Sequence, residues 1–216
     1  MLRAAVGIGL YAGAFGASFG AVAVGAGLSV AQTMVLSVVL FSGASQFAFV
    51  GVAAAGSPWA AVPAALLLGV RNAFYGVGLA QTLRPRGLRR LVTAHFVIDE
   101  TTAMALGQES PAAKRYAYWA TGLILFVLWQ LGSLSGALVG TAVDPADFGL
   151  DAAAPAVFLA LLWPSLSTAE ARWVALSGAG LAVVLVPHVP AGVPVIAAAV
   201  VALVAGLRPV AGRAAR

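Results

Sequence analysis

Long apolar stretches separated by short turns dominate the pattern of this chain. No charged residue occurs between Arg3 and Arg71, and an uncharged stretch of this length accommodates about three membrane helices at about 20 residues each. Glycine and proline turns divide this stretch, and polar segments divide the rest of the chain. The pattern predicts apolar helices near residues 5–27, 31–55, 58–82, 117–141, 152–166, 173–187 and 193–207.

Residues 90–108 form a different kind of segment, because ionisable side chains occupy its centre. If this segment crosses the membrane, the four arginines of residues 84–90 lie opposite seven other basic residues. If it enters and leaves on one side, ten basic residues share that side and only Arg3 lies on the other. Short basic loops favour the cytoplasm. The re-entrant arrangement is therefore preferred, and a full crossing is the alternative.

These observations predict an all-α polytopic membrane protein with about seven transmembrane helices plus a re-entrant segment. One of the helices, discussed below, is expected to be discontinuous. Residues 1–207 are predicted to form a single transmembrane domain, and residues 208–216 a basic cytoplasmic tail. The same count of basic residues predicts a location in the cytoplasmic membrane, with the N-terminus outside and the C-terminus inside.

Composition excludes an ordinary water-soluble protein. Hydrophobic residues make up 62% of the chain and charged residues 9%, with a mean hydropathy of +0.99, whereas soluble domains are about 45–50% apolar and about 25% charged. The formal net charge of +5 is explained by basic loops beside a membrane, so no nucleic-acid partner is predicted. With no cysteine and two histidines, neither a metal site nor another cofactor is expected.

Small residues repeat along two of the predicted helices. The repeated positions are Gly9, Gly13, Gly16 and Gly20 in the first, and Gly132, Gly136 and Gly140 near the middle of the chain. Such faces allow backbones to approach closely, which predicts tight helix packing within the protein or against a partner. Ser18 lies in the sequence GASFG, a formal match to the serine hydrolase pattern G-x-S-x-G. That pattern requires a strand-to-helix elbow and a histidine base, so an intramembrane hydrolase is only a third alternative for the function.

The predicted helix over 31–55 is interrupted by small and polar residues. The candidate substrate-binding residues in this interruption are Ser42, Gly43, Ala44, Ser45, Gln46 and Phe47. Non-helical backbone at membrane depth is tolerated only where it is buried in protein or lines a cavity, and discontinuous helices form the substrate sites of many transporters. We therefore expect an unwound segment over Ser42–Gln46 that binds a carboxylate. An unbroken helix, with Gln46 bonded to a neighbour, is the alternative.

Buried charges mark a second candidate region. Arg71 and Asn72 lie at the centre of the predicted helix over 58–82, where an arginine costs about 2.5–3.5 kcal/mol even on a lenient insertion scale. An ion pair of Arg71 with Asp99 or Glu100 would offset this cost. Asp99 is favoured, because it lies four residues after His95 on the same predicted helical face. His95, Asp99 and Glu100 are the candidate ion-coupling residues, and a purely structural ion pair is the alternative.

Four blocks of sequence resemble one family. In order, these are FSGASQFAFVGVAAAG, AALLLGVRNAFYGVGLAQTL, HFVIDETTAMAL and DFGLDAAAPAVFLALLWPSL. Their order and spacing resemble the AzlC/YgaZ family of bacterial branched-chain amino acid permeases over about residues 5–207. The resemblance implies export of branched-chain or related neutral amino acids across the bacterial cytoplasmic membrane, together with a small membrane partner of the AzlD/YgaH type. It implies no bound cofactor.

The residues and the resemblance together suggest a mechanism. The interrupted segment would bind the substrate carboxylate, and Asp99 or Glu100 would receive the ammonium group or a coupled proton. Arg71, with Asn72 beside it, would hold the carboxylates in register, and apolar walls such as Phe47 and Phe74 would accept the side chain. The chain has no phosphate-binding G-x-x-x-x-G-K-[ST] motif, so a secondary mechanism is preferred to an ATP-driven one. A scaffold subunit without transport activity is the competing class, and the sequence leaves a homo-oligomer open.

Overall fold

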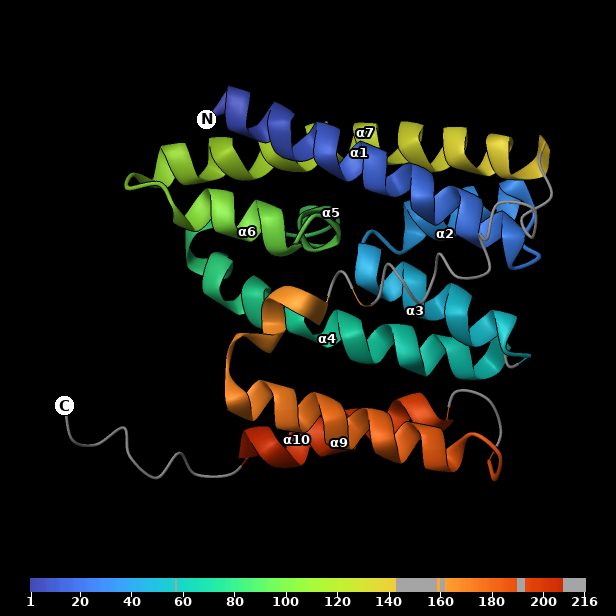
Figure 1. The fold of residues 1–216 in the computed structure, drawn as a ribbon. Helices are drawn as coiled ribbons and strands as arrows, with labels where there is room; N and C mark the ends of the chain where they lie inside the picture. The colour runs from blue at the N-terminus through green and yellow to red at the C-terminus, as the bar shows by residue number, and fades with distance from the viewer. Residues whose placement is uncertain (57, 143–158, 160–161, 190–192, 208–216) are drawn as a thin grey trace, which may run out of the picture.

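A computed structural model of the protein describes residues 1–56, 58–142, 159, 162–189 and 193–207. The described part is all helical, as predicted for this membrane protein (Figure 1). Its elements are α1 (Leu2–Gly25), α2 (Val30–Val39), α3 (Gly43–Ala54), α4 (Pro58–Leu83), α5 (Arg89–His95), α6 (Asp99–Leu106), α7 (Pro111–Ala142), the 3-10 helix η2 (Trp163–Ser167), α9 (Ala169–Leu185) and α10 (Val193–Leu207). Within the described residues, α1, α4 and α7 are long and apolar enough to cross a membrane.

The two glycine-rich helices pack against each other along their length. A Cβ atom added at Gly16 would lie 2.8 Å from the carbonyl oxygen of Trp129, and one added at Gly136 would overlap the backbone of Ala17. Successive contacts run from Gly9 beside Ile124 to Gly140 beside Ala21, so α1 and α7 are parallel. The close packing predicted from the glycine repeat is confirmed, and its partner lies within this chain.

Residues 31–55 do not form one crossing helix. α2 and α3 have 10 and 12 residues, which correspond to about 15–18 Å of helix and therefore to about half of a membrane of about 30 Å. α2 starts where α1 ends, and α3 runs back to the start of α4, where Val52 packs against Ala61. This segment is therefore a hairpin with its tip at Leu40–Ser42. The prediction that it crosses the membrane is wrong, because the chain reverses direction at the helical break.

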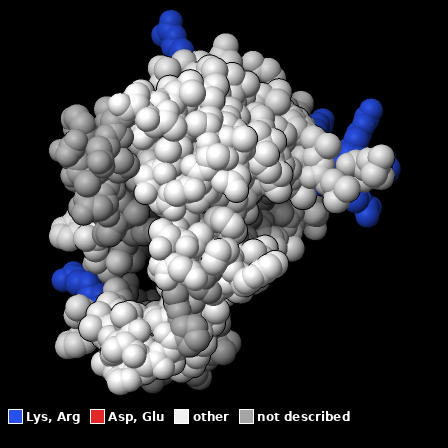
Figure 2. Space-filling view, turned by 90° about the vertical axis from the view of Figure 1, so that its right-hand side faces the viewer, with Lys and Arg blue, Asp and Glu red and all other residues white. Residues whose placement is uncertain are grey.

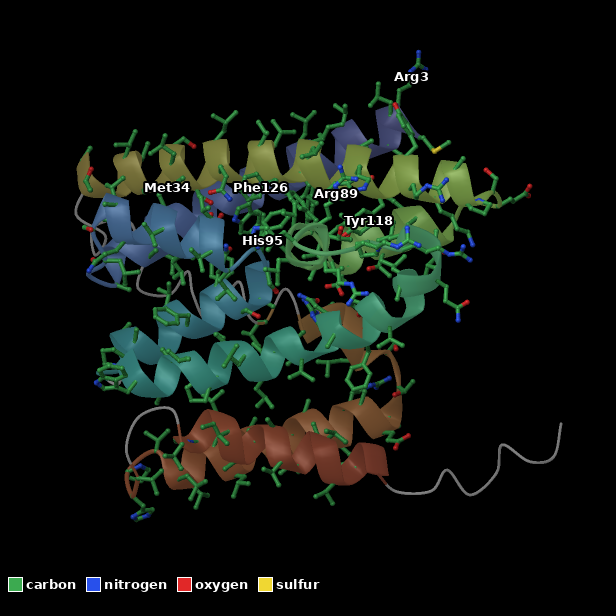
Figure 3. All side chains as sticks on the ribbon, turned by 180° about the vertical axis from the view of Figure 1, so that it is seen from behind. Arg3, Met34, Arg89, His95, Tyr118 and Phe126 are labelled. Carbon is green, nitrogen blue, oxygen red and sulfur yellow. The ribbon has the colours of Figure 1, made fainter. Side chains whose placement is uncertain are left out.

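Residues 84–110 form a second returning segment. α5 is seen end-on in Figures 1 and 3, so it runs across the direction of the long helices, and α6 then runs back toward the start of α7. A guanidinium N–H of Arg115 donates to the carbonyl of Thr82 at 3.5 Å, which places the end of α4 and the start of α7 at the same end of the bundle. This path is the re-entrant one favoured by the charge count.

The two hairpins enter from opposite ends and meet in the middle. The rings of Phe41, at the tip of the first, and Phe96, at the tip of the second, have centroids 5.8 Å apart. Each unit consists of a long helix followed by a hairpin, α1 with α2–α3 and α4 with α5–α6, in opposite directions. Oppositely directed repeats with broken helices at the midplane are typical of secondary transporters.

Basic residues gather at one end of the described bundle. Because α1 and α7 are parallel, Arg3 lies at the end that carries Lys114 and Arg115, together with the loop of residues 84–90. Figure 2 views the opposite end, where the described surface that faces the viewer is uncharged and basic side chains appear only around the outline. The expectation that Arg3 stands alone opposite the basic loops is therefore wrong, because residues 31–55 return instead of crossing.

α9 and α10 pack against each other and form a separate layer beside α4 (Figure 1). They correspond to the predicted helices over 173–187 and 193–207. The predicted helix over 152–166 lies largely outside the described residues, and the tail over 208–216 lies wholly outside them.

Candidate functional site

A cavity of about 260 Å³ lies where the two hairpin tips meet the middle of the long helices. α1, the first hairpin, α4, the second hairpin and α7 all contribute to its wall. The lining residues are Tyr11, Ala12, Phe15, Phe41, Ser42, Gly43, Ala44, Arg71, Ile98, Asp99, Glu100, Leu125 and Trp129. A cavity of this size can accommodate a single amino acid.

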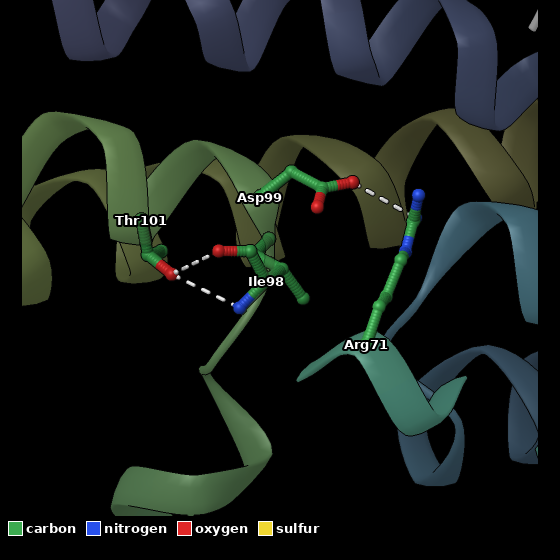
Figure 4. A network of polar contacts seen from close by, with 4 residues as sticks. All are labelled: Arg71, Ile98, Asp99 and Thr101. Atoms are coloured by element: carbon green, nitrogen blue, oxygen red, sulfur yellow. Dashed lines mark hydrogen bonds and ion pairs between the residues drawn. The ribbon is translucent and has the colours of Figure 1, made fainter. Parts of the chain in front are cut away.

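An ion pair crosses the polar side of this cavity. A terminal guanidinium nitrogen of Arg71 on α4 lies 2.8 Å from Oδ2 of Asp99 on α6 (Figure 4). The side chains of Arg71 and Asp99 are 45% and 41% exposed, so the pair is open enough to exchange partners. Glu100 lines the same cavity. The pairing of Arg71 with Asp99, favoured from the sequence, is confirmed.

The N-terminus of α3 forms a second polar element of the wall. α3 begins at Gly43, so the backbone N–H groups of Gly43, Ala44 and Ser45 have no intrahelical acceptor. These donors and the positive end of the helix dipole are suited to an anionic group. The non-helical residues are Leu40–Ser42, with Ser42 as the N-cap. The expected unwound stretch over Ser42–Gln46 is therefore misplaced, because residues 43–46 form the first turn of α3.

Each hairpin tip is held by a side chain from the helix that follows it. The amide nitrogen of Gln46 donates to the carbonyls of Leu40 at 2.7 Å and Ser37 at 3.2 Å. In the second hairpin, the hydroxyl of Thr101 lies 2.7 Å from the carbonyl of Phe96 and accepts from the N–H of Ile98 at 3.1 Å (Figure 4 draws the contacts of Thr101 with Ile98). These bonds satisfy backbone groups that the breaks leave free, as buried polar groups require.

α6 also directs its N-terminus toward the cavity. Asp99 and Glu100 are its first two residues, where the helix dipole stabilises negative charge. The polar wall thus has an anion-binding part, made by the start of α3 and by Arg71, beside a cation-binding part made by the two carboxylates. This arrangement is complementary to a zwitterion.

Aromatic and aliphatic side chains form the rest of the wall. Trp129 of α7 packs against Phe15 and Phe19 of α1 with ring centroids 6.4 and 6.2 Å away, and a Cβ added at Gly43 would lie 3.1 Å from the Trp129 ring. Tyr11, Phe41 and the other apolar members listed above complete this side. Sequence reasoning did not select Tyr11, Phe15 or Trp129, because aromatic residues are common in membrane helices and nothing in the pattern shows which ones meet.

Comparisons with known proteins agree with these features. The family model described as "AzlC protein" matches residues 7–143, which contain both hairpins and every residue of the cavity wall. The chain belongs to the AzlC family. No solved structure matches it.

Two curated relatives of this AzlC-family chain were found. It is 24% identical over 160 residues, 73% of its length, to a protein of Bacillus subtilis named "Branched-chain amino acid transport protein AzlC". It is 28% identical over 162 residues, 68% of its length, to the "Inner membrane protein YgaZ" of Escherichia coli. The matches cover 63% and 64% of these relatives, less than two thirds of either.

The structure brings together about half of the site residues expected in this family member. Six of them, Ser42, Gly43, Ala44, Arg71, Asp99 and Glu100, line one cavity. Six others do not line it. Ser45 is buried beside Gly69, Gln46 holds the first hairpin tip, and Phe47 packs against Phe15 and Phe19. Asn72 lines a different groove. Phe74 is exposed, and His95 lies among aromatic rings.

The predictions for two of these residues, Phe74 and His95, are wrong. Phe74 is 72% exposed on the outer face of α4, so it forms no wall of the cavity. His95 and Asp99 do not share a helical face, because the helix breaks over Phe96–Ile98. Figure 3 shows His95 close to Phe126, and its ring also lies 5.8 Å from that of Phe41.

The serine hydrolase pattern has no matching geometry. Ser18 lies within the uninterrupted helix α1, whereas a nucleophile elbow requires a sharp turn between a strand and a helix. The GASFG sequence instead belongs to the face that packs against α7, where Gly16 and Gly20 approach the backbone of that helix.

Proposed function

We propose that this protein is a secondary transporter that exports branched-chain or related neutral amino acids across the bacterial cytoplasmic membrane. The observation that carries the proposal is the two-sided cavity at the meeting point of the hairpins. One side offers backbone N–H groups, Arg71, Asp99 and Glu100, and the other offers apolar side chains. An amino acid with an apolar side chain has the same division, with two opposite charges at one end.

Substrate binding would proceed by exchange of ion-pair partners. The substrate carboxylate would bind Arg71 and the N–H groups at the start of α3, and its ammonium group would bind Asp99. Each charge then retains an opposite charge throughout, which limits the desolvation cost at membrane depth. The side chain would pack against the wall that contains Phe15, Leu125 and Trp129. The cavity volume of about 260 Å³ is sufficient for a single amino acid.

Glu100 is our candidate for a coupled proton. It lines the cavity beside Asp99 but takes no part in the ion pair with Arg71, so its charge can change without breaking that pair. Its protonation would remove a negative charge that competes with the substrate carboxylate. Coupling to the proton gradient or to the membrane potential, and assembly with a small AzlD/YgaH-type subunit, belong to the proposal because of the family relationship.

We propose that the basic end of the bundle faces the cytoplasm, since short basic loops favour that side. The N-terminus would then be inside, as would the end of α10, which lies at the same end in Figure 1. The chain has no cysteine, so single cysteines report sidedness without background. A cysteine at Ser110 should resist an impermeant thiol reagent added outside, whereas one at Gly27 should react. The reverse pattern would invert the orientation.

Efflux of labelled amino acids tests the transport function directly. Cells with the protein should release a branched-chain amino acid faster than cells without it, and the small subunit should be supplied in one arm. Glu100→Gln should weaken the dependence of efflux on the proton gradient, whereas Glu109→Gln, a change at an exposed carboxylate, should not. Absence of efflux for every neutral amino acid, with and without the small subunit, would favour the scaffold alternative.

A further inference from the structure

A second and larger cavity lies between the second half of α4 and α5. This groove has a volume of about 780 Å³ and is separate from the central cavity. Its lining residues are Asn72, Ala73, Gly76, Val77, Leu79, Ala80, Leu83, Arg84, Pro85, Arg86, Arg90, Thr93, Ala94 and Val97. We call it the basic groove, because three arginines lie at its outer end and the remaining wall is mostly apolar.

The arginines of the basic groove lack acidic partners. Among the described residues the one ion pair joins Arg71 to Asp99, so no described carboxylate neutralises Arg84, Arg86 or Arg90. Arg84 and Arg90 donate their Nε–H groups to the carbonyls of Gln81 at 2.8 Å and Pro85 at 3.1 Å. These bonds orient two guanidinium groups without removing their charge, and clustered arginines beside a membrane attract anionic head groups.

The apolar part of the groove has the length of one lipid leaflet. Along α4 it extends from Asn72 to Leu83, about 17 Å at the helical rise per residue. Half of a hydrocarbon core of about 30 Å is about 15 Å. The groove is also open to its surroundings, since Val77 in its wall is 75% exposed. An alkyl chain lying along this wall would reach from the arginines to the middle of the membrane.

We infer that the basic groove binds an anionic phospholipid of the leaflet at the basic end. The phosphate group lies against Arg84, Arg86 and Arg90, and an acyl chain follows the small residues Ala73, Gly76 and Ala80 of α4. A positive outer end joined to an apolar strip of leaflet length is complementary to an amphiphile with a negative head.

The lipid would lie directly behind the transport site. The inner end of the groove is formed by Asn72 and Val97, which are the chain neighbours of Arg71 and Ile98 in the central cavity. A bound acyl chain would contact Thr93 and Ala94 of the second hairpin. The carbonyl of Thr93 already accepts a hydrogen bond from the Tyr118 hydroxyl of α7. The lipid is therefore placed to stabilise the position of this hairpin tip.

Native mass spectrometry of the purified protein tests this inference. The protein would be exchanged into vesicles with equal amounts of phosphatidylglycerol and phosphatidylcholine before release. We expect the wild type to retain one phosphatidylglycerol in preference to phosphatidylcholine. Replacement of Arg84, Arg86 and Arg90 by glutamine should abolish the preference, with a loss of about fivefold for each arginine, the factor that corresponds to about 1 kcal/mol per basic residue.

Matched variants separate a groove site from general surface attraction. Replacing Arg3, Arg89 and Lys114 by glutamine removes the same charge at the same end from residues that do not line the groove, and should preserve the preference. Gly76→Trp should block retention of the lipid, whereas Gly78→Trp should not. A Cβ added at either glycine meets no atom within 4 Å, but only Gly76 lines the groove.

Three results would overturn the inference. The first is an equal loss of the lipid preference in both triple variants, which would mean diffuse attraction to the basic end. The second is reaction of Gly76→Cys with a charged, water-soluble thiol reagent, which would make the groove an aqueous entrance. The third is protection of that cysteine in detergent free of phospholipid by the co-purified small subunit, which would make the groove a protein interface.

Discussion

Two regions at the middle of this bundle are built in opposite ways. Along the contact of α1 with α7, glycines bring the helix backbones together, and a methyl group at Gly20 or Gly136 would overlap the facing chain. At the hairpin tips, helices stop halfway, and polar atoms remain without a hydrogen-bond partner, among them Oδ1 of Asp99 and Nε1 of Trp129. The first region is a closely packed frame. The second contains the polar groups that we propose bind the substrate.

The membrane explains why both regions exist in one protein. Lipid offers little hydrophobic drive for helix association, so close contact between small residues supplies the attraction that holds long helices together. Broken helices, in contrast, expose backbone groups and are tolerated only where they line a cavity. We therefore expect substitutions in the frame to affect mainly stability, and substitutions at the tips to affect mainly the proposed transport. Four substitutions, ordered from the largest to the smallest expected effect, test this division.

The frame should fail completely when one glycine is enlarged. Gly136→Leu places a side chain in the backbone of Ala17, and the strain should exceed the roughly 1–3 kcal/mol of ordinary overpacking. We expect almost no monodisperse protein in size-exclusion chromatography. Gly7→Leu on α1, where an added Cβ meets nothing within 4 Å, is the control and should behave as wild type. Normal folding of Gly136→Leu would contradict the claim that the close contact of α1 with α7 is required for stability.

The ion pair should affect activity more than folding. Arg71→Ala leaves Asp99 without its partner, so we expect efflux to be lost and the amount of protein in the membrane to fall. The double variant Arg71→Ala/Asp99→Ala should recover the amount but not the efflux. Arg71→Lys should likewise recover the amount better than the efflux, because lysine lacks the planar fork of arginine. Equal efflux by Arg71→Ala and wild type would make the pair purely structural.

Blocking the start of α3 should abolish binding and leave folding intact. In Gly43→Leu the side chain would project toward Trp129, which lies 3.1 Å from an added Cβ, and would fill part of the cavity. We expect efflux to fall at least about tenfold, the effect of about 1.4 kcal/mol, with an unchanged chromatographic profile. Gly78→Leu on α4 serves as the control. A Gly43→Leu variant with normal efflux would exclude the α3 N-terminus from the site.

The smallest effect is expected at the bonds that hold the first tip. Gln46→Ala removes two hydrogen bonds to the carbonyls of Ser37 and Leu40, at about 0.5–1.5 kcal/mol each. Thermal unfolding should shift downward modestly, and the apparent affinity for substrate should weaken severalfold. Gln108→Ala removes one bond from a residue just after α6 to the carbonyl of Met104 and should change the affinity little. Loss of affinity in both variants would indicate a general destabilisation instead.

Local properties of the sequence were sufficient to predict the class of protein and several of its parts. Apolar stretches of membrane length specified α1, α4 and α7, and the charge count favoured the return of residues 90–108. The predicted positions of Arg71 and Asp99 at membrane depth indicated their pairing, since an isolated charge there is too unfavourable. The small residues after Phe41 marked a helical break. In each case a local property, namely hydropathy, charge or side-chain size, was sufficient for the prediction.

The path of the chain after the first helical break could not be predicted from these local properties. A break in an apolar stretch looks the same whether the chain continues across the membrane or turns back, and the difference lies in contacts between distant residues, such as Gly43 with Trp129. Because the chain turns back at both breaks, the two hairpins enter from opposite ends and Arg3 lies at the basic end of the bundle. The second break also separates His95 from Asp99. Packing between α1 and α7 fixes the frame against which both tips meet, and that packing joins residues more than 100 positions apart.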